Sequence, residues 1–404
     1  MNPYIQSGVK YLDIVIQVLV SIHLLIPFLL VLIYYYKIIF TNTTFLTPSQ
    51  GLDKKFKFGI IITAHQESIF IPPIIDSILK QTYASFEVYV VADLCEISVA
   101  DYPDPRIHIL KPAVALSSNV KSIQYALDHF SADIDVMTLF DPDNLVHPFF
   151  FEELNKYYNR GYLAVQGAVE PKNIRGKYAR IDSVGMLFYS FVDRNARSLM
   201  GLSVNIWGCG ISIMTDVFRK ISFDVKSDLG GFDKHMQAEI ALHVPLIVYA
   251  PKAIVYDEKV TDSKNLENQR IRWINSWFKF LGEGVNVFSQ GLKRKNFNLL
   301  YFGFNLLRPP YFLLVFFGLV CMAINFLFFF SLFIYWAVCF AVFVLSIILI
   351  LGISQGGEAL KGVVYLPLFF YHQLRSLIHL RLNKKSMLQT AHFEVLYIDD
   401  MLKK

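Results

Sequence analysis

Long apolar stretches stand near the start and near the end of the chain. Residues 14–36 and 309–357 contain no Asp, Glu, Lys or Arg. A helix needs about 20 apolar residues to cross the hydrocarbon core of a membrane. The first stretch therefore predicts one membrane-spanning helix. The second is long enough for two, and we expect a hairpin of helices with its turn near residues 325–331.

Between these stretches, short runs of β-branched and apolar residues alternate with amphipathic segments. The runs predict buried strands, and the segments between them predict helices. Strands are expected at 58–63, 87–92, 136–140 and 163–166, and helices at 71–81 and 118–130. Strands that alternate with helices predict an α/β domain with a mostly parallel sheet that is covered on both faces.

Two further segments, 274–290 and 361–382, combine aromatic and aliphatic residues with basic ones. They predict helices that lie in the membrane interface, and ordinary packing against the soluble domain is the alternative. The expected organisation is an N-terminal anchor over 1–40, a globular domain over 51–273, an interface segment over 274–308, a transmembrane hairpin over 309–357, and a cytoplasmic interface helix with a tail over 358–404.

The composition is typical of a membrane protein. Of the 404 residues, 54% are hydrophobic and 18% are charged, whereas soluble domains carry about 25% charged residues. These values argue against a disordered chain and against a purely soluble enzyme. The net charge of +5 does not suggest nucleic-acid binding, which requires clustered basic residues. The four cysteines are scattered and form neither a disulfide framework nor a zinc spacing.

Basic residues next to the apolar stretches indicate the orientation in the membrane. Lys37 and Lys54 follow the first stretch, and Arg375 and Lys384 follow the last, whereas only Lys10 precedes the first. Basic residues flanking a span stay on the cytoplasmic side. We therefore expect a multi-pass protein of the cell membrane, with its N-terminus outside and its globular domain in the cytoplasm.

Carboxylates follow three of the predicted strands. Glu67 follows the strand at 58–63, Asp93 the strand at 87–92, and Asp141 and Asp143 the strand at 136–140. One such residue alone would usually be a cap or a turn former. In parallel sheets, however, ligands bind beyond the carboxyl ends of the strands. Two carboxylates spaced as Asp-x-Asp also supply the oxygen ligands that Mg²⁺ prefers, so we expect a metal and phosphate site here.

Four motifs in this order resemble a known enzyme family. They are AHQES at 64–68, VVADLCE at 90–96, FDPDN at 140–144 and QRIRW at 269–273. The chain resembles membrane-bound family 2 glycosyltransferases of the GT-A fold that carry a Q-x-x-R-W motif. These include cellulose, chitin, hyaluronan and poly-N-acetylglucosamine synthases and ceramide glucosyltransferase. The resemblance covers roughly residues 57–290 and extends to the flanking spans.

The resemblance implies a donor site, an acceptor site and a metal for this chain. The donor would be a UDP-sugar and the metal Mg²⁺ or Mn²⁺, bound at Asp141 and Asp143. The remaining roles that it implies are nucleotide binding by Glu67 and Asp93, contact with the diphosphate by Lys121 and Arg272, and acceptor binding by Gln269 and Trp273. It also implies that residues 205–210 belong to the acceptor site, and 389–392 faintly resemble a loop of processive members.

The segment expected to carry the general base differs from the family pattern, in which a Glu-Asp pair usually stands at this place. Here Phe232 precedes Asp233, and Glu239 is the competing candidate. In the family a second acidic pair follows the base by about two dozen residues. Asp257 stands 24 residues after Asp233 (257 − 233) and 18 after Glu239 (257 − 239). A carboxylate at a helix N-terminus is also stabilised by the exposed amides, so Asp233 is favoured over Glu239 and over a plain N-cap role.

Together these features predict an integral membrane glycosyltransferase, and the resemblance implies that it inverts the anomeric carbon. It would transfer a hexose to a lipid or lipid-linked acceptor at the cytoplasmic face of the membrane. The alternative acceptor is a growing polysaccharide, for which three spans would need an oligomer or a partner subunit to form a channel. A catalytically inactive scaffold is a third hypothesis, which the presence of Asp93, Asp141, Asp143, Asp233 and Arg272 argues against.

Overall fold

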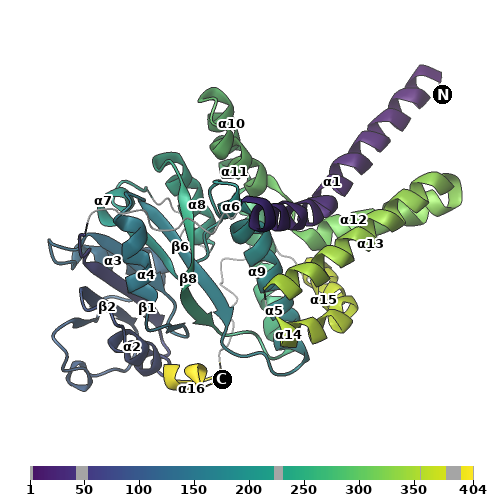
Figure 1. Cartoon of the computed structure of the whole chain (residues 1–404). Helices are drawn as coiled ribbons and strands as arrows, with labels where there is room; N and C mark the ends of the chain where they lie inside the picture. Colours follow the sequence, from purple (N-terminus) through teal and green to yellow (C-terminus); the bar gives the residue numbers. More distant parts are fainter. Residues whose placement is uncertain (1–2, 42–52, 223–230, 355, 379–392, 404) are drawn as a thin grey trace.

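A mixed sheet of eight strands forms the centre of the globular part (Figure 1). The structure is a computed structural model, and it describes residues 3–41, 53–222, 231–354, 356–378 and 393–403. The strands lie in the order β3-β2-β1-β4-β7-β6-β8-β5. Their bounds are β1 Phe58–His65, β2 Phe86–Asp93, β3 Ile107–Leu110, β4 Val136–Phe140, β5 Leu145–Val146, β6 Ala164–Pro171, β7 Ile211–Met214 and β8 Ile247–Asp257.

The sheet confirms the predicted mostly parallel α/β class. β3, β2, β1 and β4 run parallel, β6 and β8 form a second parallel pair, and β7 joins the two groups as an antiparallel strand. The four strands expected from the sequence are all present, and β3, β5, β7 and β8 add to them. The pairing of His65 with Asp93 brings the ends of β1 and β2 together.

Helices cover both faces of the sheet because successive strand side chains point to opposite sides. Ile60 and Ile62 of β1 pack with α2 and α4, whereas Ile61 packs with α3 and α8 on the other face. These helices are α2 Ile71–Leu79, α3 Asn119–Asp128, α4 Phe150–Tyr158 and α8 Phe232–His243. The expected helices at 71–81 and 118–130 thus correspond to α2 and α3.

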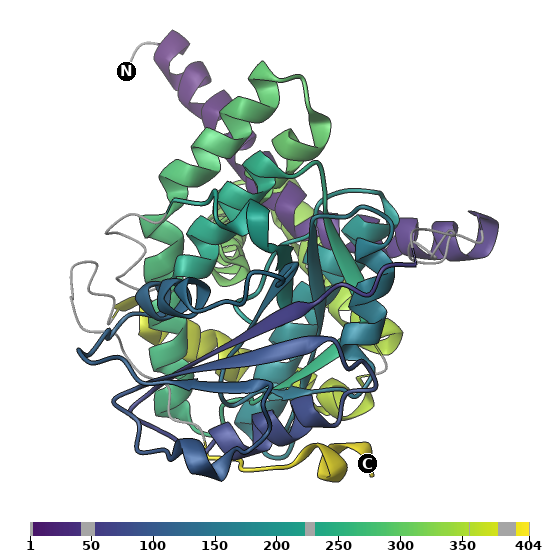
Figure 2. The same ribbon diagram turned by 90° about the vertical axis from the view of Figure 1, so that its left-hand side faces the viewer.

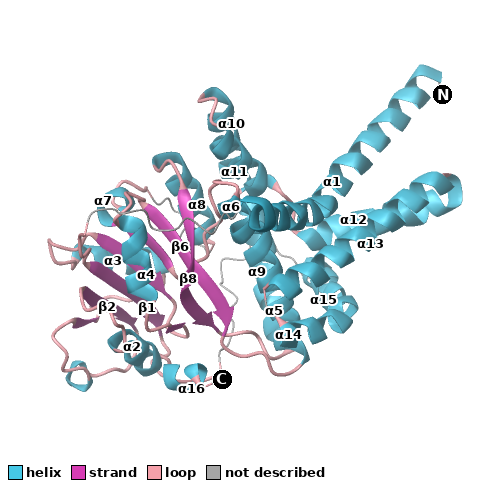
Figure 3. Ribbon diagram, in the orientation of Figure 1, coloured by secondary structure: helices cyan, strands magenta, loops and turns pink. Residues whose placement is uncertain are grey.

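Within the residues that the structure describes, three helices are long and apolar enough to cross a membrane. They are α1 Pro3–Thr41, of which Asp13–Thr41 is the apolar part, α12 Tyr311–Phe328 and α13 Phe330–Ile353. They pack together in one apolar cluster and extend away from the sheet on the same side (Figures 1 and 3). The break at Phe329 between α12 and α13 lies within the expected turn.

The remaining helices are shorter. They are η1 Val99–Asp101, α5 Lys177–Ser190, a π-helix η2 Phe191–Asn195, α6 Ala196–Leu199, α7 Thr215–Phe218, α9 Ser263–Lys279, α10 Leu281–Lys293, α11 Phe297–Leu307, α14 Gly357–Leu360, η4 Lys361–Tyr365, α15 Leu366–Ile378 and α16 Ile398–Leu402. Several of them, among them α5, α9 and α15, lie between the sheet and the membrane helices (Figure 1). Figure 2 shows the sheet end of the molecule, with the C-terminal segment along its lower edge.

The helix expected over 274–290 is instead divided between α9 and α10, with a break at Phe280. Gly282 and Gly284 follow this break, and glycine is a poor helix former. The following helix α11 folds back onto α10. The two backbones approach closely where Gly291 faces Leu300 and Gly303 faces Phe288. A side chain at either glycine would clash with the opposite backbone, so α10 and α11 form a tight helical hairpin and 274–290 is not one continuous helix.

Candidate functional site

The carboxylate of Asp93 lies buried at the end of β2, inside a ring of donors. The backbone N–H groups of Leu116 and Ser117 donate to it over 3.0 and 2.8 Å, and the Nδ1 atom of His65 lies 2.8 Å from its Oδ2 atom. Burial raises the pKa of Asp93, but these hydrogen bonds lower it more, so the net pKa is lowered. Asp93 is therefore held as an anion, and His65 is a neighbour that the sequence analysis did not identify.

The backbone around Asp93 is strained. Gln66, Leu94 and Ser117 have φ angles of 65°, 59° and 47° without being glycines. Such conformations are costly and tend to gather at binding and catalytic sites. Glu67 lies exposed in the same turn, and its carbonyl accepts a hydrogen bond from the Cys95 thiol.

Lys121 lies exposed in the first turn of α3, just after this strained region. The hydroxyl of Ser118 caps the helix by accepting a hydrogen bond from the Lys121 N–H over 3.2 Å. The cap fixes where α3 begins, so Lys121 stands at the same edge of the sheet as Asp93. This is the position in which a lysine could reach an anionic ligand bound beyond the strand ends.

The loop that carries Asp141 and Asp143 connects β4 to β5 and is tied down by Asn144. The Asn144 side chain accepts from the Asp141 N–H over 2.9 Å and donates to Asp257 over 3.2 Å. The ammonium group of Lys172, at the end of β6, donates to the Asp143 carbonyl over 3.1 Å. Contacts from β6 and β8 thus fix the shape of the Asp-x-Asp loop.

Arg272 of α9 lies within electrostatic reach of carboxylates from three different elements. Asp141 and Asp143 come from the β4 loop, Asp233 from α8 and Asp257 from the end of β8. Burial lowers the pKa of Arg272 and the four carboxylates raise it, with a net lowering. Four carboxylates that stand far apart in the sequence therefore lie within electrostatic reach of one arginine.

Asp233 lies in the first turn of α8, which begins at Phe232. The preceding Gly231 adopts a left-handed conformation with φ of 78°, and a side chain there would clash with Ser276. Only glycine fits this start, so the sequence Gly-Phe-Asp places the carboxylate at the exposed amides of the helix. Glu239 lies later in α8, where its carbonyl accepts from His243.

A divalent cation would find two protein ligands rather than a complete cage. Within the described residues, no three His, Cys, Asp or Glu side chains are grouped in a way that could hold a metal ion. Asp141 and Asp143 nevertheless fit Mg²⁺ or Mn²⁺, because such ions in nucleotide sites take one or two carboxylates and complete their shell with phosphates and water.

Gln269 and Trp273 stand on the same helix as Arg272, next to an apolar cavity. Trp273 is 46% exposed, and the Arg270 guanidinium lies 4.2 Å from its ring centroid. The Gln269 Oε1 atom is buried and makes no hydrogen bond within the described part of the chain. Arg270 itself is buried and pairs with Asp182.

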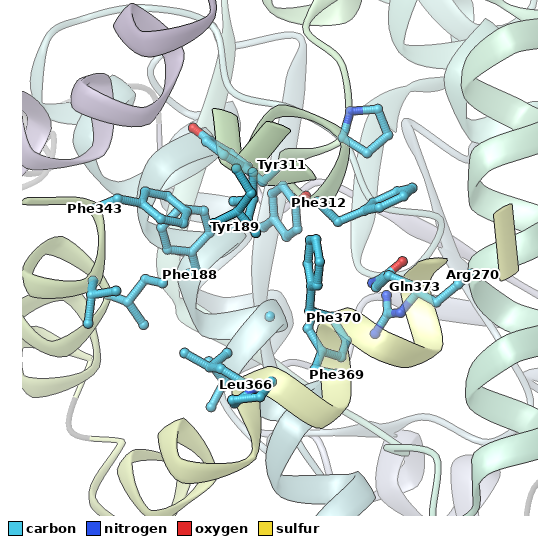
Figure 4. Close-up of a pocket in the computed structure, with 18 of the residues that line it drawn as sticks. Phe188, Tyr189, Arg270, Tyr311, Phe312, Phe343, Leu366, Phe369, Phe370 and Gln373 are labelled. Carbon is cyan, nitrogen blue, oxygen red and sulfur yellow. The ribbon is translucent and has the colours of Figure 1, made fainter. Parts of the chain in front are cut away.

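The cavity has a volume of about 430 Å³ and lies between α5, α9, α12, α13 and α15 (Figure 4). Its walls are mainly aromatic and aliphatic, and they include Phe188, Tyr311, Phe343, Leu366, Phe369 and Trp273. The cavity lies where the membrane helices contact the globular part. The sequence analysis did not identify it, because the five helices are brought together only by the fold.

Residues 205–210 lie beside the Asp-x-Asp loop. Trp207 stacks on the buried Arg194 guanidinium at 3.7 Å from its ring centroid. Burial raises the pKa of the Cys209 thiol well above its usual range, and nearby Asp257, Asp141 and Asp143 raise it further. The electrostatic influence of these carboxylates shows that Cys209 lies near the Asp-x-Asp loop, and a role of 205–210 in acceptor binding stays a prediction. Residues 389–392 lie outside the described residues.

The chain was compared with known protein families and structures. Residues 56–276 match the family described as "Glycosyltransferase like family 2". The chain belongs to this family. The match covers the sheet, the Asp-x-Asp loop and α9 with Gln269, Arg272 and Trp273. No curated protein sequence matches the chain.

A solved mannosyltransferase shares the fold. The mannosyltransferase PcManGT from Pyrobaculum calidifontis, solved in complex with GDP-Man and Mn²⁺, aligns with a TM-score of 0.56 at 14% identity. The alignment covers 89% of this chain and 97% of that one. Residues 1–349 of S. aureus TarS align with a TM-score of only 0.39 at 14% identity, over 57% of this chain and 66% of that one. The family 2 glycosyltransferase thus has the GT-A type of sheet that the sequence predicts.

Proposed function

We propose that this chain is an integral membrane glycosyltransferase of the Q-x-x-R-W type, which transfers a hexose from a UDP-sugar to a lipid or lipid-linked acceptor. The observation that carries the proposal is the position of α9. Arg272 on this helix lies within electrostatic reach of Asp141, Asp143, Asp233 and Asp257, while the adjacent Trp273 lines the apolar cavity among the membrane helices. One helix therefore connects a polar site suited to a nucleotide-sugar with an apolar site suited to a lipid.

The donor would bind along the strand ends. Glu67 and Asp93 would contact the nucleotide, and Lys121 and Arg272 the diphosphate. The P. calidifontis enzyme, with its bound GDP-Man and Mn²⁺, supports a nucleotide-sugar and a divalent metal for this fold. Asp141 and Asp143 would hold Mg²⁺ or Mn²⁺, which would neutralise part of the diphosphate charge.

The reaction would be a single displacement with inversion. Asp233 would accept the proton of the acceptor hydroxyl while that oxygen forms a bond to the anomeric carbon. The bond from this carbon to the diphosphate would break, and the negative charge on the leaving group would be stabilised by Arg272, whose planar fork suits a diphosphate. Arg272 is within electrostatic reach of Asp233, which supports Asp233 rather than Glu239 as the base.

The acceptor would enter from the membrane. The cavity beside Trp273 is lined mainly by Phe, Tyr, Leu, Val and Ile side chains of the membrane and interface helices. Apolar walls are suited to a lipid chain, whereas a growing polysaccharide would need polar contacts along its path. Gln269 and Trp273 would hold the acceptor headgroup between this cavity and the donor.

We propose that residues 51–273 form the catalytic domain on the cytoplasmic side. Three described helices with the length and apolarity of membrane spans support this arrangement, and so does the excess of Lys and Arg after the first and last spans. Access of a membrane-impermeant protease to 51–273 in inside-out vesicles, but not in right-side-out vesicles, would test it.

Radiolabelled transfer tests the function. Purified protein would be incubated with a panel of UDP-sugars, Mn²⁺ and a total lipid extract, and the product divided into organic and aqueous phases. We expect label in the organic phase with wild type and none with Asp233→Asn. Label in an insoluble or aqueous polymer would instead identify a polysaccharide synthase. No transfer and no donor hydrolysis with any sugar would favour an inactive scaffold.

A further inference from the structure

A C-terminal segment reaches back to the end of β8, far from the membrane helices that precede it in the sequence. The backbone N–H groups of Phe393 and Glu394 donate to the two carboxylate oxygens of Glu258, over 2.8 and 3.2 Å. The segment is also docked on the globular domain, because Ile398 of α16 is fully buried and Asp399 pairs over 2.7 Å with Lys80, which directly follows α2. α16 lies beside α2 at the lower edge of the molecule (Figure 1).

Glu258 connects this segment to the Asp-x-Asp loop through Lys172. The Lys172 ammonium group lies 3.9 Å from the Glu258 carboxylate, and the side chains are 1% and 3% exposed. The same ammonium group donates to the Asp143 carbonyl over 3.1 Å. Two buried, opposite charges thus form a continuous chain of contacts from the backbone of Phe393 to the backbone of Asp143.

Lys172 and Glu258 thus hold the backbone of Asp143, one of the two residues that fit a metal ion, without being metal ligands themselves. Groups that hold a ligand in place, without touching the metal, fix its orientation and strongly affect metal affinity. The pair of Glu258 and Lys172 lies in the interior, where a charge that loses its partner cannot be compensated by water. A shift of Glu258 would therefore be transmitted to Lys172 and to the loop that carries Asp143.

We propose that residues 393–403 form a clasp that positions the metal-binding loop through Glu258 and Lys172. Lys172 and Glu258 are positioning residues, and neither is proposed to touch the metal. The inference rests on the proposed function only in taking Asp141 and Asp143 as the metal ligands. It predicts that metal affinity depends on contacts made by a segment near the end of the chain.

The backbone contact at Phe393 offers a matched pair of variants. Phe393→Pro removes the N–H group that donates to Glu258, whereas Phe393→Ala keeps it and removes only a side chain that is 63% exposed. Mn²⁺ binding to the full-length protein would be measured by electron paramagnetic resonance of the free ion, with UDP present. We expect the proline variant to bind Mn²⁺ about 10-fold more weakly and the alanine variant to match wild type.

The docking of α16 offers a second pair. Ile398→Asp places a charge in a fully buried position, and Leu402→Asp places the same charge on the same helix where the side chain is 49% exposed. Hydrogen exchange at residues 393–403 would report whether the segment detaches. We expect detachment and weaker Mn²⁺ binding with Ile398→Asp, and neither effect with Leu402→Asp.

Asp143→Ala separates this inference from the proposed function. If Asp143→Ala binds Mn²⁺ as wild type does, the metal assignment fails. If it loses Mn²⁺ while Phe393→Pro and a detached Ile398→Asp variant bind Mn²⁺ normally, the clasp is refuted and the metal assignment stands. Lys172→Arg, which keeps the charge, should retain more Mn²⁺ affinity than Lys172→Met, whereas equal affinities would contradict a role for this lysine.

Discussion

Asp233 is the residue on which the proposed chemistry depends most. Asp233→Asn keeps the size of the side chain and an oxygen for the helix N-terminus but removes the proton acceptor. We expect kcat to fall by about 10²–10⁴ while UDP affinity stays near wild type, as measured by initial rates and by titration of UDP. Glu239→Gln serves as the control and should remain active. An inactive Glu239→Gln beside an active Asp233→Asn would assign the base to Glu239.

Arg272 and Trp273 are adjacent, but we expect them to affect different substrates. Arg272→Lys keeps the charge and loses the planar fork, so UDP should bind more weakly. Trp273→Ala removes a face of the cavity and should impair transfer to the acceptor while UDP affinity is retained. Titration of UDP against both purified variants distinguishes the two roles. A parallel loss of UDP affinity and transfer in Trp273→Ala would mean that the tryptophan only supports the fold.

The sequence singles out several of the candidate residues because they stand beside recognisable elements. Glu67, Asp93 and Asp143 come directly after apolar runs, and Asp233 follows a glycine that starts a helix. It could not locate His65 or Lys172, because their roles depend on partners distant along the chain. Lys172 reads as an ordinary lysine after a strand, and only the fold shows that its ammonium group is buried among Asp143, Asp257 and Glu258.

Among the elements, α8 is fixed by a titratable contact with α10. The Nδ1 atom of His235 lies 2.7 Å from the Glu283 carboxylate, and its Nε2 atom lies 2.6 Å from the Ser222 carbonyl oxygen. The hydrogen bond to Glu283 raises the pKa of His235, burial opposes it and the Ser222 carbonyl adds to it, so the pKa rises from 6.5 to about 9. Protonated His235 therefore stabilises the folded state.

The sign of this contribution sets its pH dependence. The stabilisation by protonated His235 is complete below pH 6.5, which is the pKa of histidine in the unfolded chain. It is lost as the pH rises through about 9, the pKa in the folded protein. We expect the Tm of the solubilised protein to fall between these values, and His235→Gln to lower the Tm at pH 6 and to remove part of this slope. His243→Gln, on an exposed position of the same helix, is the control. An unchanged slope in His235→Gln would show that another group is responsible.

A polar contact holds the membrane helices in register. The side chains of Asn325 of α12 and Trp336 of α13 both donate to Gln17 of α1, each over 2.8 Å. Gln17→Leu would leave two buried donors without this acceptor, and hydrogen bonds between membrane helices contribute about 0.6–2 kcal/mol. We expect a lower Tm in detergent, partly restored in the double variant Gln17→Leu/Asn325→Leu. A double variant less stable than Gln17→Leu would contradict this explanation.

Prediction of the elements from sequence succeeded where the apolar run was long. Four or more apolar residues mark β1, β2 and β4, whereas β8 was missed despite its eleven residues because a proline and a lysine interrupt its apolar pattern. β5 has only two residues, and β3 and β7 have four each. Such short strands are defined by the neighbours with which they pair rather than by their own pattern. The single helix expected over 274–290 was wrong because Phe280 ends α9, and the packing of Gly291 and Gly303 then turns the following segment back on itself.

At the scale of the whole molecule, the sheet and the membrane helices meet around α9. The composition and the apolar stretches predicted the two halves separately. They could not predict the cavity, because it is enclosed by residues as far apart in the sequence as Val184, Phe343 and Phe369. If this cavity holds the lipid acceptor, each half of the molecule binds one of the two substrates. A substitution in the cavity should then weaken binding of the lipid and leave UDP affinity unchanged.

Filling the cavity tests this connection. Gly185 of α5 lines the cavity, and a Cβ atom there would lie 4.0 Å from Phe369. Gly185→Leu would place an aliphatic side chain in the space proposed for the lipid without touching Arg272 or the carboxylates. We expect KM for the lipid acceptor to rise at least about 10-fold, since the lost volume removes apolar contacts worth about 0.8 kcal/mol per CH₂ group, while UDP affinity stays at the wild-type level.

Gly352→Leu is the matched control, because Gly352 also lies in a helix but has open space around it. It should leave both substrates unaffected. Initial rates at varied lipid concentration, together with UDP titration, give the two quantities for each variant. A Gly185→Leu enzyme with an unchanged KM for lipid would place the acceptor elsewhere. One with weakened UDP binding and a lowered Tm would show instead that the substitution disturbs α5, in which case Val184→Phe provides a second filling of the same space.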